Sequence, residues 1–281
     1  MISFEPMARQ RRRRPLLHLV LIPLAVVFST PLIWMVLTSL KPPEQITAEP
    51  HRALPREWRW DNYREAVSAV PYARYLRNSL VLCAGSVLGT LCSCTLAAYA
   101  FARLRWPGRD VLFGLMIATM LLPWHVTMIP RFVLLRELGL YNSLAALIVP
   151  TFFGDAFTIF LLRQFFLTIP EEMSEAARLD GCSEAGVFAR IVLPLSKPAL
   201  ATAGLFQFIA CWNDFSGPLL YLNDPNRFPL SYGLEQFISS YSSQVHLLMA
   251  AATLFILPIV LLFFLAQRTF LEGIATTGLK G

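Results

Sequence analysis

Long apolar runs separated by short polar stretches make up most of this chain. A helix needs roughly 20 mostly apolar residues to cross ~30 Å of hydrocarbon, at about 1.5 Å per residue. Each run of this length is expected to form one span, which predicts an all-α polytopic membrane protein with six transmembrane helices in a single domain, residues 1–281. The six runs are Pro15 to Leu40, Asn78 to Phe101, Val111 to Pro130, Tyr141 to Phe166, Pro198 to Leu222 and His246 to Ala266.

Two longer polar stretches interrupt the apolar pattern. Residues 41–77 are rich in proline, tryptophan and mixed charge, and we expect them to pack as a small lobe outside the membrane. The second stretch, residues 168–197, is named the polar loop. Its Thr168 and Glu171 have the spacing of a capping box, which predicts the start of a helix. Gly181 should end that helix, because glycine readily adopts a left-handed backbone, and Ser183 should cap a second short helix.

Composition agrees with a membrane location, since 56% of the residues are hydrophobic, 15% are charged and the mean hydropathy is +0.54. The net charge of +6 does not indicate nucleic-acid binding, because five basic residues cluster at Arg9 and Arg11–Arg14, just before the first apolar run. Positive residues beside a span favour the cytoplasmic side. We therefore expect residues 1–14, the polar loop and the tail at 267–281 to be cytoplasmic, and residues 41–77 to be external.

Small residues follow one another at four-residue spacing along the second apolar run, at Gly85, Gly89, Ser93 and Ala97. Such a stripe lets another helix approach closely. Two interpretations fit it: internal packing, or an interface with a second membrane subunit.

Polar residues inside apolar runs are candidates for the substrate path. A charge in the apolar core costs at least ~2.5 to 3.5 kcal/mol, so Asp155 should face a cavity, a partner chain or the membrane boundary. A structural pairing of Asp155 fits equally well. Trp212, Asn213 and Asp214 combine an aromatic face with hydrogen-bonding groups, as binding of a sugar ring would require, but they also fit an anchor at the outer membrane interface.

The polar loop carries a family resemblance. The order Glu175-Ala176-Ala177, then Gly181, then Ile191-x-Leu193-Pro194 resembles the cytoplasmic signature loop of permease subunits in binding-protein-dependent ABC importers. The cluster Trp212 to Phe215 and the ending Leu271 to Gly281 resemble the sugar-importing branch, and more closely the shorter of two paired permeases in maltose and glycerol-phosphate type importers.

This resemblance implies that the polar loop docks on a separate ATPase subunit. The residues it assigns to coupling are Glu171, Glu175, Ala176, Ala177, Asp180, Gly181, Ile191, Leu193 and Pro194. It further implies a second permease subunit, an extracytoplasmic solute-binding protein and the lipid of a bacterial-type cytoplasmic membrane as partners, with a sugar or sugar-like solute as substrate.

The chain contains no Gly-x-x-x-x-Gly-Lys-Ser/Thr loop, so we expect ATP to be bound by the partner ATPase and no cofactor or metal by this chain. It is therefore predicted to be a transport subunit and not an enzyme. One alternative is a secondary transporter driven by an ion gradient, with Asp155 or Asp214 as its titrating group. For the polar loop alone, a helix lying on the lipid headgroups is the alternative.

Overall fold

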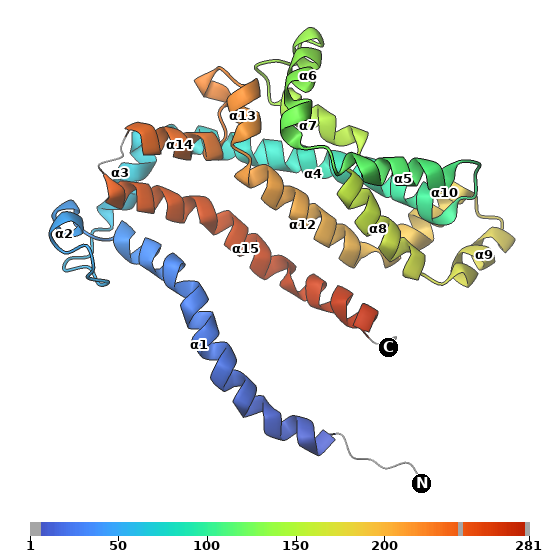
Figure 1. Ribbon diagram of the computed structural model, residues 1–281, viewed down its shortest axis with the longest axis horizontal. Helices are drawn as coiled ribbons and strands as arrows, with labels where there is room; N and C mark the ends of the chain where they lie inside the picture. The colour runs from blue at the N-terminus through green and yellow to red at the C-terminus, as the bar shows by residue number, and fades with distance from the viewer. Residues whose placement is uncertain (1–6, 241–243, 279–281) are drawn as a thin grey trace. The chain divides into compact units, whose positions relative to one another are not determined.

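The computed structural model describes residues 7–240 and 244–278, and within these ranges all regular secondary structure is helical (Figure 1). Three helices contain unbroken candidate spans: α1 (Met7–Ser39), α4 (Tyr72–Arg103) and α15 (Val245–Gly278). Three bent helix pairs bring the candidate spans to as many as six. The all-helical, multi-span fold class is confirmed, although half of the predicted single helices are broken.

The third apolar run is not one helix, so the prediction for Val111 to Pro130 is wrong. It forms α5 (Arg109–Thr119) and α6 (Trp124–Glu137), whose axes meet at 99°. Pro123 at the break has an extended backbone, with φ −61° and ψ 139°. Proline has no amide hydrogen to donate and disfavours helix at the residue before it, so the chain turns there.

The fourth run also bends, by 41°, between a short helical segment and α8 (Ala156–Thr168). The segment comprises α7 (Ala145–Ile148) and the 3-10 helix η1 (Val149–Phe153). Gly154 has φ +92°, a left-handed value that glycine tolerates. Asp155 follows it and caps α8, since its carboxylate accepts a hydrogen bond from the Thr158 amide at 2.8 Å.

The fifth run is interrupted as well. The helix α12 (Lys197–Asn213) ends just before Asp214. The Asp214 carboxylate accepts a hydrogen bond from the amide of Gly217 at 3.0 Å, in the first turn of α13 (Ser216–Tyr221). The 3-10 helix η3 (Pro225–Arg227) and α14 (Leu230–Ser240) follow. Both intramembrane aspartates therefore have a structural task, because each satisfies a helix-end amide.

The boundaries of the polar segments also differ from the predicted ones. Helix α4 begins before residue 77, α8 runs through Thr168 and α12 begins at Lys197, so residues 41–77 and the polar loop are both shorter than expected. Helix α15 continues into the predicted tail at 267–281. Residues 1–6 and 279–281 of the two predicted terminal stretches lie outside the described residues.

The small-residue stripe of α4 packs inside this chain. Gly85 faces the side chain of Ile148, and a Cβ atom on Gly89 would lie only 2.3 Å from the Thr151 hydroxyl oxygen. The Ser93 hydroxyl donates a hydrogen bond to the carbonyl of Thr151 at 3.0 Å. These contacts explain Gly85, Gly89 and Ser93 by internal packing against α7 and η1.

The chain divides into two compact units, residues 1–70 with 237–254 and residues 71–236 with 255–281. The first unit contains α1, α2 (Pro43–Ala48) and α3 (Asp61–Ala69). Its lobe packs around the fully buried Asn62, whose side-chain amide donates to the carbonyls of Ser39 at 2.8 Å and Lys41 at 3.0 Å. The Lys41 ammonium in turn donates to the carbonyl of Arg52 at 2.7 Å.

We expect Asn62→Leu to loosen this lobe, because it leaves two carbonyls without their donor. The free energy that holds the lobe folded should fall by about 1–3 kcal/mol. Amide hydrogen exchange over residues 43–69 measures it, with faster exchange as the expected result. The matched control is Arg64→Leu, an exposed position on the same helix. Equal exchange in the two variants would contradict a structural role for Asn62.

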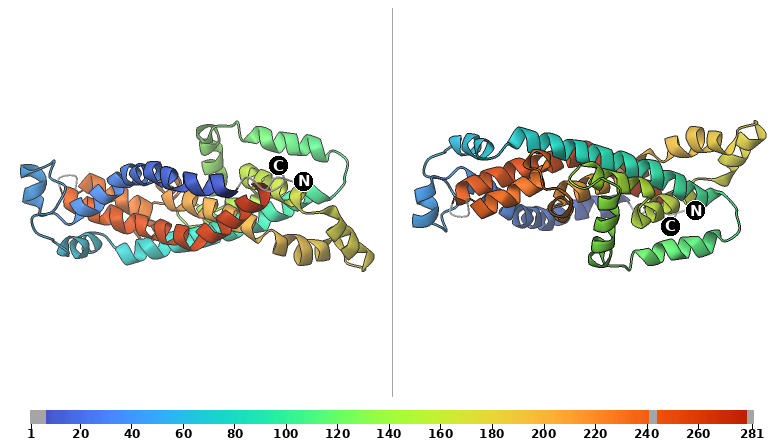
Figure 2. Two further views of the ribbon diagram at one scale, coloured as in Figure 1. Left: turned by 90° about the horizontal axis from the view of Figure 1, so that it is seen from below. Right: turned by 90° about the horizontal axis from the view of Figure 1, so that it is seen from above.

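The second unit contains α4 through α13, and it places the polar loop. Figures 1 and 2 show α9 (Glu171–Leu179) at the end of this unit where α4 and α8 finish, and α10 (Glu184–Val187) follows it in the polar loop. Its core is formed by buried side chains of α4, α8, α12 and the polar loop, including Tyr99, Phe166 and Val192. The loop is therefore packed onto the ends of membrane helices.

Candidate functional site

The polar loop folds around a sharp bend. Gly181 has φ +84° and follows α9, and the Ser183 hydroxyl accepts a hydrogen bond from the Gly186 amide at 3.2 Å at the start of α10. Both predictions at these residues are confirmed. The capping box is wrong: Thr168 ends α8, and its hydroxyl donates to the Phe165 carbonyl at 2.7 Å. Pro170, which has no side-chain acceptor, takes the cap position of α9 instead.

Beyond α10 the loop continues as a π-helical turn (Phe188–Val192) and the short α11 (Leu193–Leu195). The axis then turns by 78° into α12. Of the three residues assigned to coupling here, Ile191 and Leu193 are half-buried and Pro194 is exposed. This part of the loop is therefore mainly a support for the bend.

The two adjacent alanines of α9 have different surroundings. Ala177 is buried in the same core as Tyr99 and Phe166, so it seats α9 against the membrane helices. Ala176, one helical step away, is exposed. A larger residue at 177 would push α9 outward, whereas one at 176 would change only the outer surface.

The outer face of α9 combines acidic and apolar side chains. Glu171, Glu175, Asp180 and Gly181 are exposed as well as Ala176. Leu179 lies on the same helix with 89% of its surface exposed, and Met173 is 43% exposed. Sequence reasoning missed Leu179, although its position three residues after Ala176 indicates a shared helix face. We name Met173, Ala176 and Leu179 the outer apolar face.

Hydrogen bonds tie the loop to α4. Arg103, the last residue of α4, donates to the carbonyl of Phe166 at 2.6 Å and also to that of Ile169. Tyr99 donates to the carboxylate of Glu184 at 2.7 Å. Arg178 of α9 donates to the same carboxylate at 2.7 Å, and this hydrogen bond raises the pKa of Arg178. Glu184 thus joins both arms of the bend to α4.

A second candidate site is a hollow of about 570 Å³ inside the same unit, named the central hollow. Its wall comes from α4, α6, α7, η1, α12, α13 and the link at residues 154–155. Both aspartates predicted for the substrate path line it. The other polar and aromatic groups in its wall include Trp124, Arg131, Gln207, Cys211 and Tyr221.

The other two predicted path residues do not line the central hollow. Trp212 is 1% exposed, its indole N–H donates to the carbonyl of Phe255 at 3.1 Å, and its ring stacks on Phe208 with centroids 5.4 Å apart. Asn213 is exposed and donates to the carbonyl of Ile209 at 2.8 Å. Trp212 is therefore a packing residue, neither part of this hollow nor an exposed interface anchor.

Arg131, Gln207 and Tyr221 were missed by sequence reasoning. They come from three different helices, so no local motif joins them. Tyr221 is 2% exposed, and its buried hydroxyl has no hydrogen-bond partner within the described part of the chain. An unsatisfied buried hydroxyl is unfavourable, by about 1–3 kcal/mol.

Bent membrane helices around a polar hollow, with a packed polar loop at one end, define a multi-pass transport subunit. Residues 86–275 match the family described as binding-protein-dependent transport system inner membrane component, and this chain belongs to that family. It is therefore a multi-pass inner-membrane subunit of a transport system that uses a binding protein. The resemblance found in the sequence is confirmed, and the alternative of an ion-driven secondary transporter is set aside.

Several relatives extend over nearly the whole chain. A probable ABC transporter permease protein, YurM of Bacillus subtilis, is 35% identical across 91% of this chain and 85% of the relative. The arabinooligosaccharides transport system permease protein AraQ of the same organism is 31% identical across 92% of each chain. The sulfoquinovosyl glycerol transport system permease protein SmoH of Agrobacterium fabrum is 32% identical across 89% of this chain and 88% of the relative.

The fold also matches a solved transporter. A chain from the crystal structure of a bacterial ABC transporter that imports the acidic polysaccharide alginate superposes with a TM-score of 0.81. The match covers 96% of this chain and 100% of that chain, at 24% sequence identity. The helical breaks described above thus occur in a chain with the fold of an ABC importer permease. The protein is a transport component and not the ATPase.

Proposed function

We propose that this chain is one of two paired permeases that move a sugar or oligosaccharide into the cell, with ATP hydrolysed by separate ATPase subunits. The sugar assignment is supported by the relatives named for transport of arabinooligosaccharides and sulfoquinovosyl glycerol. Under this proposal the chain needs no cofactor of its own. A solute-binding protein delivers the solute from the external side, where residues 41–77 lie.

The observation that carries the coupling proposal is the two-sided character of α9. Its inner side is packed through Ala177, whereas its outer apolar face exposes a leucine at 89%. Exposed large apolar side chains rimmed by charge are typical of protein interfaces. We infer that this face, with Glu175 and Asp180 beside it, seats in a cleft of a cytoplasmic ATPase subunit.

Movement of the loop would reach the membrane helices through the contacts already described. Arg103 joins the end of α4 to the end of α8 and to Ile169. Glu184 joins α9 and α10 to α4, and Ala177 is buried in the same core as Phe166 of α8. When two ATPase subunits close on ATP, such a braced loop would move with these helices as a rigid body. That displacement would switch access to the transport path between the two sides of the membrane.

Reconstitution tests this function. Solubilised protein should co-purify with an ATPase and a second permease, and proteoliposomes containing this complex should take up solute only with ATP and the external binding protein. Collapsing proton and sodium gradients should leave the uptake rate unchanged, since ATP supplies the energy. Uptake by this chain alone, driven by an ion gradient, would refute the proposal.

A further inference from the structure

The central hollow points to a solute site within this subunit. We propose that it binds one neutral, polyhydroxylated sugar unit, with Tyr221, Arg131 and the two aspartates as its polar contacts, and that it disfavours solutes carrying a carboxylate. The inference rests on the proposed function, because it names the substrate class of the same transport path. It adds that this chain contacts the solute itself.

The first support is the hydroxyl of Tyr221. Tyr221 lies in the wall of the hollow, and its hydroxyl is buried without a hydrogen-bond partner among the described residues. A phenol hydroxyl can donate one hydrogen bond and accept others, as a sugar hydroxyl can. A bound sugar unit would therefore supply the missing partner, which an apolar occupant could not do.

Tyr221 is also held in place, as a binding residue must be. Its ring stacks with Phe132 at a centroid distance of 6.3 Å, and its carbonyl accepts a hydrogen bond from the amide of Asn142 at 2.8 Å. Asn142 has φ +55°, a left-handed conformation that asparagine tolerates better than most residues. In this conformation the backbone amide of Asn142 bonds to Tyr221 at the end of α13, and its side chain bonds to the loop that follows.

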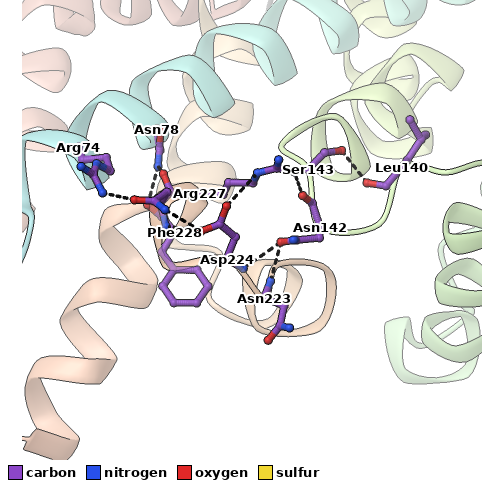
Figure 3. A network of polar contacts seen from close by, with 10 residues as sticks. Arg74, Asn78, Leu140, Asn142, Ser143, Asn223, Asp224, Arg227 and Phe228 are labelled. Carbon is purple, nitrogen blue, oxygen red and sulfur yellow. Dashed lines mark hydrogen bonds and ion pairs between the residues drawn. The ribbon is translucent and has the colours of Figure 1, made fainter.

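Figure 3 shows the polar network that fixes this loop. The side-chain oxygen of Asn142 accepts hydrogen bonds from the amides of Asn223 and Asp224, both at 2.9 Å, and Arg227 donates to the Asn142 carbonyl. Asn78 of α4 donates to the carbonyl of Phe228 at 3.0 Å. The segment that follows Tyr221 is thus tied to both α4 and the 140–143 loop.

The second support is that the charged side chains of the hollow have hydrogen-bonding atoms without a partner among the described residues. Asp155 and Asp214 each cap a helix with one carboxylate oxygen, and the structure shows no hydrogen bond to the other oxygen from any described residue. Arg131 likewise makes no ion pair or hydrogen bond to another described residue, although its guanidinium offers five donors. Donors and acceptors are therefore both available to a ligand.

The charge balance of the hollow selects between neutral and acidic sugars. Two carboxylates and one guanidinium leave the wall with an excess of negative charge. A carboxylate on a solute would be repelled by this excess, and such repulsion is strong where little water screens it. A neutral sugar can donate hydroxyl hydrogens to the aspartates and accept from Arg131 and Gln207, while Trp124 offers an aromatic face.

Direct binding to the complete importer, held in lipid nanodiscs without its binding protein, tests the proposal. The probes are two neutral oligosaccharides, arabinotriose and N,N′-diacetylchitobiose, and the acidic alginate trisaccharide, with calorimetry as the measurement. At least one neutral probe should bind more tightly than the acidic one. Tyr221→Phe, which removes only the hydroxyl, should weaken that binding by about five- to tenfold.

Two further variants sharpen the test. Tyr141→Phe is the matched control, because Tyr141 also packs on Phe132, with centroids 5.5 Å apart, but does not line the hollow. It should leave binding unchanged. The double variant Asp155→Asn with Asp214→Asn keeps both helix caps, since asparagine caps as well as aspartate. It gives the wall an excess of positive charge and should strengthen binding of the alginate trisaccharide.

The outcomes separate this proposal from the proposed function. Equal effects of Tyr221→Phe and Tyr141→Phe, no binding of any probe, or acidic binding as tight as neutral binding in the unmodified complex would overturn the solute site. Each of these can occur while ATP-driven uptake by the complex is intact. Failure of ATP-driven uptake, with probe binding and the Tyr221→Phe effect both present, would instead contradict the coupling proposal alone.

Discussion

Leu179→Asp is expected to disconnect the permease from its ATPase. The substitution places a charge at the most exposed large side chain of the outer apolar face, where a partner cleft would have to bury it. Buried apolar anchors contribute at least ~2 kcal/mol to an interface, which corresponds to roughly 30-fold in affinity. We therefore expect a more than tenfold fall in both ATPase co-purification and ATP-driven uptake.

Folding should be nearly unaffected by this change, because Leu179 is 89% exposed. Surface substitutions of this kind usually alter the free energy of unfolding by less than ~0.5 kcal/mol. The matched control is Leu54→Asp, also an exposed leucine at 59%, in the lobe of residues 41–77. It should leave ATPase co-purification intact. A Leu179→Asp protein that still co-purifies with the ATPase would show that this face is not the docking surface.

Gly89→Val should prevent the second unit from packing correctly. A Cβ atom at Gly89 would lie 2.3 Å from the hydroxyl oxygen of Thr151 and 2.7 Å from a ring carbon of Phe152, well inside contact distance. The Thr151 hydroxyl cannot move without losing its hydrogen bond to the Ile148 carbonyl, which measures 2.7 Å. Overpacking costs ~1–3 kcal/mol or more, so the folded yield should fall several-fold.

Gly114→Val provides the comparison for this prediction. Gly114 lies within α5, and a Cβ atom there would meet nothing within 4 Å among the described residues. Its substitution tests the general cost of valine in a membrane helix without the steric clash. Fluorescence-detected size exclusion and thermal unfolding measure both variants. Equal yields for the two would contradict the tight packing of α4 against η1.

The features that the sequence alone could predict depend on composition and on residues close together along the chain. Apolar run length identifies candidate spans because crossing a bilayer requires a fixed number of apolar residues. The bend at Gly181 and the cap at Ser183 were predictable because backbone conformation and capping depend on a few neighbouring residues. Family membership was recognisable for a similar reason, since the spacing in the polar loop is contained in one continuous stretch.

The breaks within apolar runs show where such reasoning stops. Hydropathy is the same for a straight helix and a bent one, so the corners at Pro123 and Gly154 do not change it. Pro23 and Pro31 lie within the continuous α1, whereas Pro123 marks a 99° corner. Proline by itself therefore does not decide where a membrane helix breaks, because neighbouring packing determines whether the lost hydrogen bond is tolerated.

The central hollow was decided only by tertiary structure. Trp212 and Asp214 are two residues apart, yet Trp212 is buried against Phe208 and Phe255 while Asp214 lines the hollow. Successive helical side chains point about 100° apart, so sequence neighbours face different surroundings. Arg131 and Tyr221 line the same hollow although they are distant along the chain, so no local sequence motif could have predicted that they lie together.

The sequence by itself thus determined the membrane class, the position of the polar loop and its bend, because these depend on composition and on contacts close along the chain. Only the tertiary structure decided which face of α9 is exposed and which side chains share the hollow, because burial depends on packing between distant segments.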